Sequence, residues 1–285
     1  MFDKYNLWYS PTGYYDTLQE IILSDTHVLI AGCTGSGKSV LLNSLIHTAL
    51  LRNPAQVGFA LIDPKRIDLV QYRDLPHTDI YRSDPHECYL LLKNVLDLIE
   101  RRYKHVQNGG AMPKREMYVI IDELADLMTV NKKEIMPVLQ RILQTGRAAN
   151  VHVIACTQCP IVQVIPTQLK VNFTLCVGLH TRSAQDSRNI IGRNGCEQLP
   201  RYGKCILALP DGWKMADVRK IPDEEIGSRI AWWAAQRTKR GRVRLAKQRI
   251  KKYGSLDPNV ELQNKTIALA NAAQPVKIRG AQYYY

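Results

Sequence analysis

Near its start the chain reads Gly32-Cys33-Thr34-Gly35-Ser36-Gly37-Lys38-Ser39. These residues fit the P-loop pattern, in which four variable positions separate the first glycine from Gly-Lys-Ser. The glycines let backbone N–H groups turn inward around phosphate oxygens, and a following helix adds the positive end of its dipole. We therefore expect this loop to bind a nucleoside triphosphate, with Lys38 on the β- and γ-phosphates and the Ser39 hydroxyl on Mg²⁺.

The sequence around this loop predicts an α/β fold. An apolar run over 27–31 precedes the loop, and residues 38–51 place apolar side chains at helical spacing after it. Short strands that alternate with helices indicate a mostly parallel central sheet flanked by helices. Further strands are expected over 57–62, 118–121, 151–155, 173–177 and 205–209, and further helices over 86–106 and 134–146.

Two adjacent acids follow the apolar run over 118–121. In a parallel sheet they would lie at the same edge as the P-loop, because ligands gather at the carboxyl ends of the strands. We expect Asp122 to bind Mg²⁺ through water and Glu123 to act as general base on the attacking water, which contributes ~10²–10⁴ in rate. This pair favours hydrolysis over phosphoryl transfer to a metabolite, which needs no activated water.

The base of the nucleotide is predicted to be adenine. A GTPase needs an Asn-Lys-x-Asp motif after a strand, whereas the nearest segment, Asn131-Lys132-Lys133-Glu134, ends in Glu. We interpret that segment as the start of a helix. The sequence therefore favours ATP as the nucleotide.

A third polar position follows the strand expected over 151–155. Gln158 could sense the γ-phosphate or orient water, although a glutamine after a strand can also be purely structural. Cys156 and Cys159 form a lone Cys-x-x-Cys pair without a second pair of ligands, so we expect neither zinc nor redox chemistry. The 7 cysteines are an odd number at irregular spacing, which is typical of reduced, mostly buried thiols in a cytoplasmic chain.

Length and charge limit the number of domains and the kind of partner that the chain can have. The 285 residues predict one or two domains, and 39 Lys and Arg against 26 Asp and Glu give a net charge of +13. Such a charge suggests nucleic acid or anionic lipid as partner. No apolar run is long enough to span a membrane. We expect a lead-in over 1–26, a P-loop domain over 27–222, and a basic, helical tail over 223–285 that grips DNA or is simply solvated.

Over most of its length, from about residue 27 to 209, the chain resembles the motor domain of the FtsK/SpoIIIE DNA translocases, a branch of the FtsK–HerA group of RecA-like P-loop ATPases. The similar segments are Thr34-Gly-Ser-Gly-Lys-Ser39, Leu61-Ile-Asp-Pro-Lys65, Glu100-Arg-Arg-Tyr-Lys104, Ile120-Ile-Asp-Glu-Leu-Ala-Asp-Leu-Met128, Gly146-Arg-Ala-Ala-Asn-Val-His152, Ala155-Cys-Thr-Gln-Cys-Pro160 and Asp186-Ser-Arg188.

This resemblance implies a homo-hexameric ring that threads double-stranded DNA, with ATP bound between subunits. It implies that Arg147 is an arginine finger for a neighbour's nucleotide, that Arg188 is a second candidate, and that Gln158 is the sensor. The alternative for Arg147 is a solvated arginine at the end of a helix. Lys65 would face the nucleotide or a neighbour.

The chain also departs from the family pattern. Cys159 stands where the family usually has Arg, and we expect this chain to contain neither the membrane domain nor the winged-helix module of the cell-division members. These departures favour a translocase of a plasmid, conjugative element or phage, with a relaxase or replication initiator as possible partner. The alternatives are a coupling or packaging ATPase acting on single-stranded DNA or protein–DNA complexes, and a slow, nucleotide-switched DNA-binding replication or partition protein.

Overall fold

The computed structural model describes residues 22–24, 27–158, 160–161 and 164–236. The described residues up to Ile230 belong to one compact unit, and residues 231–236 belong to a second. Most of the expected lead-in, Cys159 and the basic tail beyond residue 236 lie outside the described residues. A helix spans 223–236, and the domain boundary expected at residue 222 stays a prediction.

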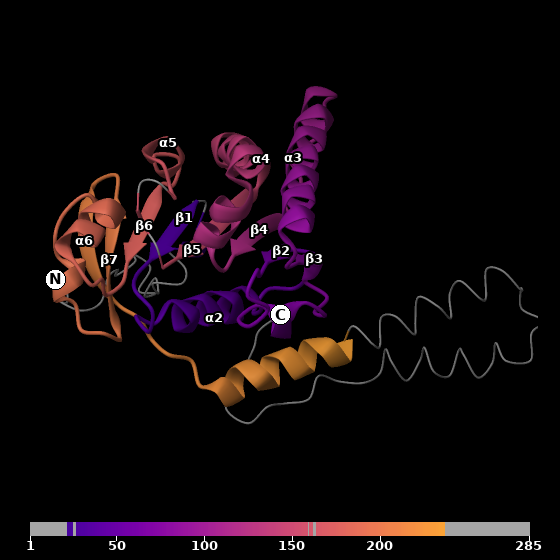
Figure 1. Ribbon diagram of the computed structural model, residues 1–285. Coiled ribbons are helices and arrows are strands. Elements are labelled where there is room, and N and C mark those ends of the chain that lie inside the picture. Colours follow the sequence, from indigo (N-terminus) through magenta and orange to yellow (C-terminus); the bar gives the residue numbers. More distant parts are fainter. Residues whose placement is uncertain (1–21, 25–26, 159, 162–163, 237–285) are drawn as a thin grey trace, which may run out of the picture. The chain divides into compact units, whose positions relative to one another are not determined.

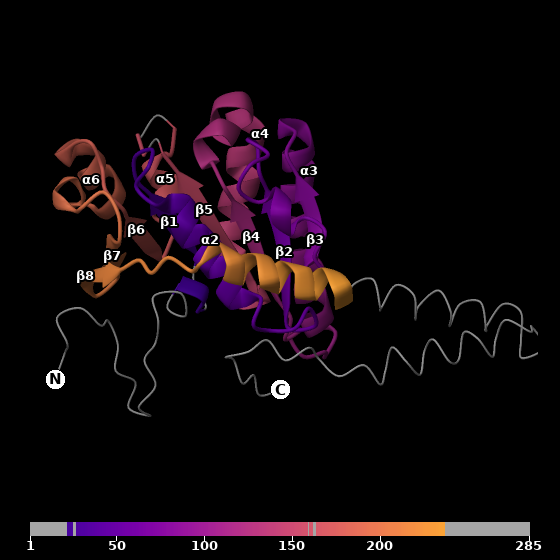
Figure 2. The same cartoon turned by 90° about the horizontal axis from the view of Figure 1, so that it is seen from below.

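One sheet of eight strands organises the described residues, in the order β3-β2-β4-β5-β1-β6-β7-β8. The strands from β3 to β6 run parallel, whereas β7 and β8 are antiparallel additions at one side (Figures 1 and 2). The predicted mostly parallel α/β fold is therefore confirmed. The strands are β1 Val28–Ala31, β2 Val57–Ile62, β3 Thr78–Arg82, β4 Glu116–Ile121, β5 Val151–Thr157, β6 Leu175–Gly178, β7 Lys204–Leu209 and β8 Gly212–Asp217.

Helices cover both faces of this sheet. Helices α3 and α4 lie on one face and α2 lies on the other, as Figures 1 and 2 show from two directions. Among the described residues, no helix has the length and apolar character needed to cross a membrane. The helices are α2 Lys38–Ala49, α3 Pro85–Gln107, α4 Leu124–Thr145, α5 Thr167–Lys170 and α6 Ala184–Ile191, with 3₁₀ turns η1 Val70–Tyr72, η2 Arg147–Ala149 and η3 Cys196–Gln198.

The sequence predicted the central strands, but it did not predict the two outermost strands. Every residue of β1, β2 and β5 is buried, as expected for a sheet covered on both faces. These strands are apolar except for His152 and Thr157 of β5. The edge strands β3 and β8 were missed because each is largely polar or exposed.

Helix α4 begins ten residues before the helix expected over 134–146. Asn131, which we expected at a helix start, has φ −146° and ψ 51° and lies at a kink inside α4. The acids at 122 and 123 therefore lead directly into a helix, rather than into a loop.

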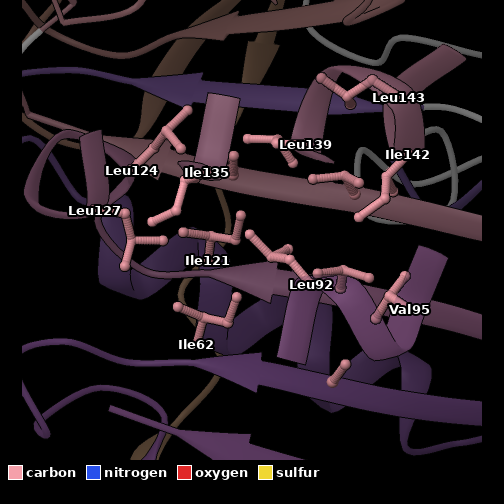
Figure 3. Packing of buried hydrophobic residues seen from close by; sticks show 14 of the residues in the cluster. Ile62, Leu92, Val95, Ile121, Leu124, Leu127, Ile135, Leu139, Ile142 and Leu143 are labelled. Atoms are coloured by element: carbon pink, nitrogen blue, oxygen red, sulfur yellow. The ribbon is translucent and has the colours of Figure 1, made fainter. Parts of the chain in front are cut away.

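A single apolar core fixes α3 and α4 on the sheet. Ile62 and Ile121 from the strands meet Leu92 of α3 and Leu127 and Leu139 of α4, and all five are fully buried (Figure 3). Burying a side chain of this size stabilises the fold by about 1.5–3 kcal/mol. Because β2 and β4 end at Ile62 and Ile121, this core holds the residues that follow those two strands.

Helix α3 also anchors the segment that connects α4 to β5. The Arg102 guanidinium is buried and donates to the carbonyl oxygens of Ala149, Asn150 and Arg115. The neighbouring Tyr103 hydroxyl donates to the Thr145 carbonyl at 2.6 Å. These bonds give a structural reason for the Glu100–Lys104 segment, since they hold the turn that carries Arg147.

We expect Arg102→Met to lower the free energy of unfolding by about 2–3 kcal/mol, because three carbonyl groups lose a charged donor while the apolar stem is kept. Urea denaturation measures this loss. Arg101→Met is the matched control, since Arg101 is exposed on the same helix and its loss should change stability by less than about 0.5 kcal/mol. Equal stability of both variants would contradict the anchoring role.

Candidate active site

The predicted site residues of three strands meet at one edge of the sheet. Strand β1 pairs with β5, and β5 pairs with β4, all parallel, with Ala31 opposite Thr157 and Ile121 opposite Ala155. The residues that follow these strands therefore leave the sheet at the same edge. This arrangement brings together the P-loop, the acids after β4 and Gln158.

The P-loop has the backbone geometry that its glycines predict. Gly37 has φ +94°, in the left-handed region, and forms the N-cap of α2, which favours glycine. Position 32 has no room for a side chain, because an atom added as Cβ of Gly32 would lie 2.6 Å from Ser36 Oγ and 2.7 Å from Leu179 Cβ. The loop and the helix that follows it thus form a closely packed unit.

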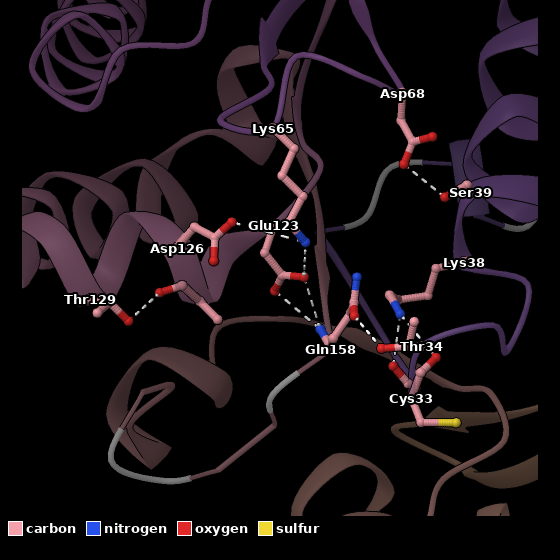
Figure 4. Close-up of polar contacts among 12 residues, drawn as sticks. Cys33, Thr34, Lys38, Ser39, Lys65, Asp68, Glu123, Asp126, Thr129 and Gln158 are labelled. Carbon is pink, nitrogen blue, oxygen red and sulfur yellow. Dashed lines mark hydrogen bonds and ion pairs between the residues drawn. The ribbon is translucent and has the colours of Figure 1, made fainter.

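Lys38 lies inside this loop rather than in solvent. Its ammonium donates to the carbonyl oxygens of Gly32 at 2.8 Å and Cys33 at 3.2 Å (Figure 4). Burial lowers the pKa of Lys38, and the negative charge of Glu123 partly offsets that effect. Phosphate oxygens entering the loop would replace these carbonyl acceptors and supply the anionic partner that a buried ammonium lacks.

Carboxylates surround the first turn of α2. Ser39 Oγ donates to Asp68 Oδ2 at 2.7 Å (Figure 4). Burial, followed by the negative charges of Asp68 and Asp63, raises the pKa of Asp122 to about 7. Asp63 is fully buried after β2 and accepts the backbone N–H of Leu69, which orders the loop that carries Asp68. Repulsion among these acids is what a bound cation would relieve.

This oxygen-rich arrangement fits Mg²⁺, which prefers oxygen ligands and retains several waters. In the described part of the chain, no three His, Cys, Asp or Glu side chains form a group that could hold a metal ion by themselves. Phosphate oxygens and water would therefore complete the coordination around Ser39 and Asp122. Asp68 was not predicted, because only the fold of the loop after β2 brings it to Ser39.

Glu123 is the centre of a polar network that reaches the P-loop. Its carboxylate is 3% exposed and accepts the Gln158 backbone N–H at 3.1 and 3.3 Å. The Lys65 ammonium lies 3.2 Å from its Oε2. The Gln158 side chain in turn accepts the Thr34 hydroxyl at 2.7 Å (Figure 4). The predicted base is thus fixed in position, and Lys65, only loosely assigned from sequence, is its ionic partner.

The two predicted arginines are not part of this network. Arg147 precedes β5 in the chain, so the seven residues of that strand separate it from Gln158, a distance of roughly 20 Å. It is exposed at the opposite edge of the sheet. Arg188 lies on α6 and donates to Asn194 and Gln185. Arg147 therefore lies too far from the P-loop to contact the nucleotide of its own chain, and Arg188 is held by its own neighbours on and after α6.

Cys156 lies one residue before the end of β5, and its thiol is buried. Burial raises its pKa well above the usual value, which leaves the thiol unreactive. Cys159, the other cysteine of the Cys-x-x-Cys segment, lies outside the described residues.

Comparison with known proteins places this geometry in a family. The sequence matches the profile of the FtsK/SpoIIIE family over residues 17–112 and 106–162. It is 37% identical over 204 residues to the DNA translocase FtsK of Streptococcus agalactiae, a match that covers 64% of this chain and 25% of the relative. The match to the DNA translocase FtsK of Lactococcus lactis subsp. cremoris is 38% identical and covers 27% of it. The chain thus spans about a quarter of the length of these relatives.

Solved structures show the same fold at low identity. The cytoplasmic domain of the Thermomonospora curvata type VII secretion ATPase EccC is similar with a TM-score of 0.62 and 22% identity, covering 72% of this chain and 27% of that one. The pCW3 conjugation coupling protein TcpA, determined with ATPγS, is similar with a TM-score of 0.63 and 20% identity, covering 73% and 64%. These similarities establish a P-loop ATPase fold.

The acid cluster predicts a measurable dependence of stability on pH. The folded-state pKa of Asp122, about 7, exceeds the reference value of 3.8, so the folded state binds this proton more tightly than the unfolded state. The stability that Asp122 contributes is therefore greatest below pH 4 and is lost as the pH rises toward 7. We expect Asp122→Asn to stabilise the metal-free protein at pH 8 by more than about 1 kcal/mol, with the gain shrinking toward pH 4.

Thermal unfolding in EDTA at a series of pH values checks this prediction. Asp97→Asn is the control, because Asp97 is exposed on α3 and its loss should leave the pH profile unchanged. A destabilised Asp122→Asn protein at pH 8 would contradict the proposed electrostatic strain.

Proposed function

This chain belongs to the FtsK/SpoIIIE family, and from that premise we propose that it is an ATPase motor that moves along double-stranded DNA. The observation that carries the proposal is the buried Glu123 carboxylate, held beside a complete P-loop by Lys65 and Gln158. A purely nucleotide-binding loop needs no such base. A motor needs one, because each step requires water to hydrolyse the bond between the β- and γ-phosphates of ATP.

The residues of the site divide the work of hydrolysis. The loop over 32–39 would bind the phosphates of ATP through its backbone N–H groups, with the Lys38 ammonium on the β- and γ-phosphates. Ser39 and Asp122 would hold Mg²⁺, which supplies positive charge to the phosphate oxygens. Glu123 would accept a proton from the attacking water, and Gln158 would link the position of Glu123 to that of Thr34.

Completion of the site requires a second copy of the chain. Arg147 is exposed at the edge of the sheet opposite to the P-loop, on a turn that Arg102 holds in place. From that position it can reach only the nucleotide of a neighbour, where an arginine finger contributes ~10³–10⁵ in rate. We therefore propose a closed homo-hexameric ring with ATP between subunits. Arg188 is the second candidate for such a contact.

The charge of the chain fits DNA as the substrate. A net charge of +13 favours a polyanion, and contacts made mainly with phosphates tolerate any sequence while weakening steeply with salt. We propose that the basic residues from Arg229 onward contribute to this grip. We further propose a role in transfer, replication or maintenance of a plasmid, conjugative element or phage, with a relaxase or replication initiator as possible partner.

We expect Glu123→Gln to lower DNA-stimulated ATP turnover about 10²–10⁴-fold while retaining ATP binding, since only the proton acceptor is lost. Lys38→Ala should abolish turnover through weakened phosphate binding. Steady-state phosphate release with and without duplex DNA measures both effects. The control is Glu100→Gln, an exposed acid on α3, which should turn over like the unaltered protein. Undiminished turnover in Glu123→Gln would rule out the assignment of the base.

Translocation on double-stranded DNA makes a separate prediction. The protein should displace the third strand of a DNA triplex only with hydrolysable ATP, and its ATPase should respond to duplex more than to single-stranded DNA. Stronger stimulation by single strands would favour a coupling or packaging ATPase. Triplex binding without displacement would favour a nucleotide-switched DNA-binding protein instead.

A further inference from the structure

The two ends of a nucleotide in the P-loop must face different parts of the sheet. Asp122 and Glu123 follow β4, which lies two strands to one side of β1, whereas β6 and β7 lie on the other side. If the terminal phosphate faces the acids, the nucleoside leaves the loop on the side of β6 and β7. Because β7 is antiparallel to β6, with Ile206 opposite Gly178, the turn before β7 lies at the edge that holds the P-loop.

Arg201 of this turn lies directly against the P-loop. An atom added as Cβ at Gly35 would be 2.9 Å from Arg201 Nη2 and 3.4 Å from its Nε. Gly35 has φ +74° and is one of the two exposed residues of the loop. No acidic side chain in the described part of the chain forms an ion pair with Arg201, so its charge is available to a phosphate.

The backbone holds this turn at the loop. The Cys33 N–H donates to the His180 carbonyl at 2.9 Å, and His180 Nδ1 lies 2.8 Å from the carbonyl oxygen of Leu199. Leu199 is buried. His180 therefore ties the P-loop to a fixed point two residues before Arg201, and the approach of Arg201 to Gly35 is built into the fold.

Tyr202 adds an exposed aromatic ring beside this charge. Its side chain is 63% exposed, and the Arg201 guanidinium carbon lies 5.9 Å from its ring centroid. Tyr202 contributes little to the core, whereas stacking of a nucleobase on an aromatic ring is worth ~1–3 kcal/mol. A guanidinium can bind phosphate, and an exposed aromatic ring can stack on a base. Arg201 and Tyr202 therefore match the two chemical parts of a nucleotide.

We propose that Arg201 and Tyr202 hold the nucleoside end of the ATP bound by their own chain, with Arg201 on the inner phosphates and Tyr202 stacked on the adenine. This inference rests on the proposed ATP site and deepens it. The two residues are binding residues, distant from the bond that is broken. They should therefore set affinity and leave the chemical step unchanged.

The chain provides a matched control pair. Arg193 lies over the ring of Trp213 with 5.3 Å to the centroid, but no contact links Arg193 to the P-loop among the described residues. We expect Arg201→Ala to weaken binding of ADP and of inorganic tripolyphosphate by roughly tenfold, as for loss of one charged hydrogen bond, and Arg193→Ala to bind both normally. Tyr202→Ala should weaken ADP binding by roughly tenfold without affecting tripolyphosphate, and Tyr202→Phe should bind both normally.

Isothermal calorimetry with Mg²⁺ measures these affinities, and steady-state kinetics should show a raised KM with unchanged kcat for Arg201→Ala. Normal ADP affinity in both Arg201→Ala and Tyr202→Ala, with binding by the unaltered protein, would overturn this inference and leave the ATP site standing. A fall in kcat at unchanged affinity would also overturn it. Absence of ADP and ATP binding to the folded, unaltered protein would instead refute the proposed function itself.

Discussion

The Glu123 carboxylate accepts the Gln158 backbone N–H, and this contact depends on the parallel pairing of β4 with β5. Pairing of β5 with β1 then sets the distance between Gln158 and the P-loop, which the bond from Thr34 closes. A slip of one residue in either register would move a site residue by about 3.3 Å and turn its side chain to the other face. The positions of the site residues therefore depend on the register of three buried strands.

Buried charge is the second constraint on this site. Lys38 is desolvated against loop carbonyls, and Asp122 is desolvated beside two further acids. Neither charge is well compensated by the protein alone, and each has the sign that a nucleotide phosphate or a cation would neutralise. Such strain is tolerated because the apolar core between the sheet, α3 and α4 is large and contiguous. The cost in stability is what gives the site its affinity for a charged ligand.

The sequence predicted the parts of the site that depend on local pattern. The P-loop, Asp122, Glu123 and Gln158 each follow a short apolar run that is typical of a buried strand, and strands are found at those runs. Asp68, the ion pair of Lys65 with Glu123, and the approach of Arg201 to Gly35 could not be predicted in this way. They depend on how irregular loops close over the strand ends, for which no periodicity exists. The edge strands escaped prediction for a related reason, since pairing rather than burial defines them.

The end of the sheet that carries Arg147 is as well ordered as the end that carries the P-loop. Arg102 and Tyr103 satisfy carbonyl groups on both sides of the turn that carries Arg147. The turn that carries Arg147 lies one strand length from the P-loop of its own chain. Its order would have a function if the turn contacts the P-loop of another subunit. In a ring, the same rigid sheet would then transmit the position of one nucleotide to the next, because its two edges can move only together. Coupling between neighbouring subunits would thus follow from the stiffness of the sheet, without a separate moving part.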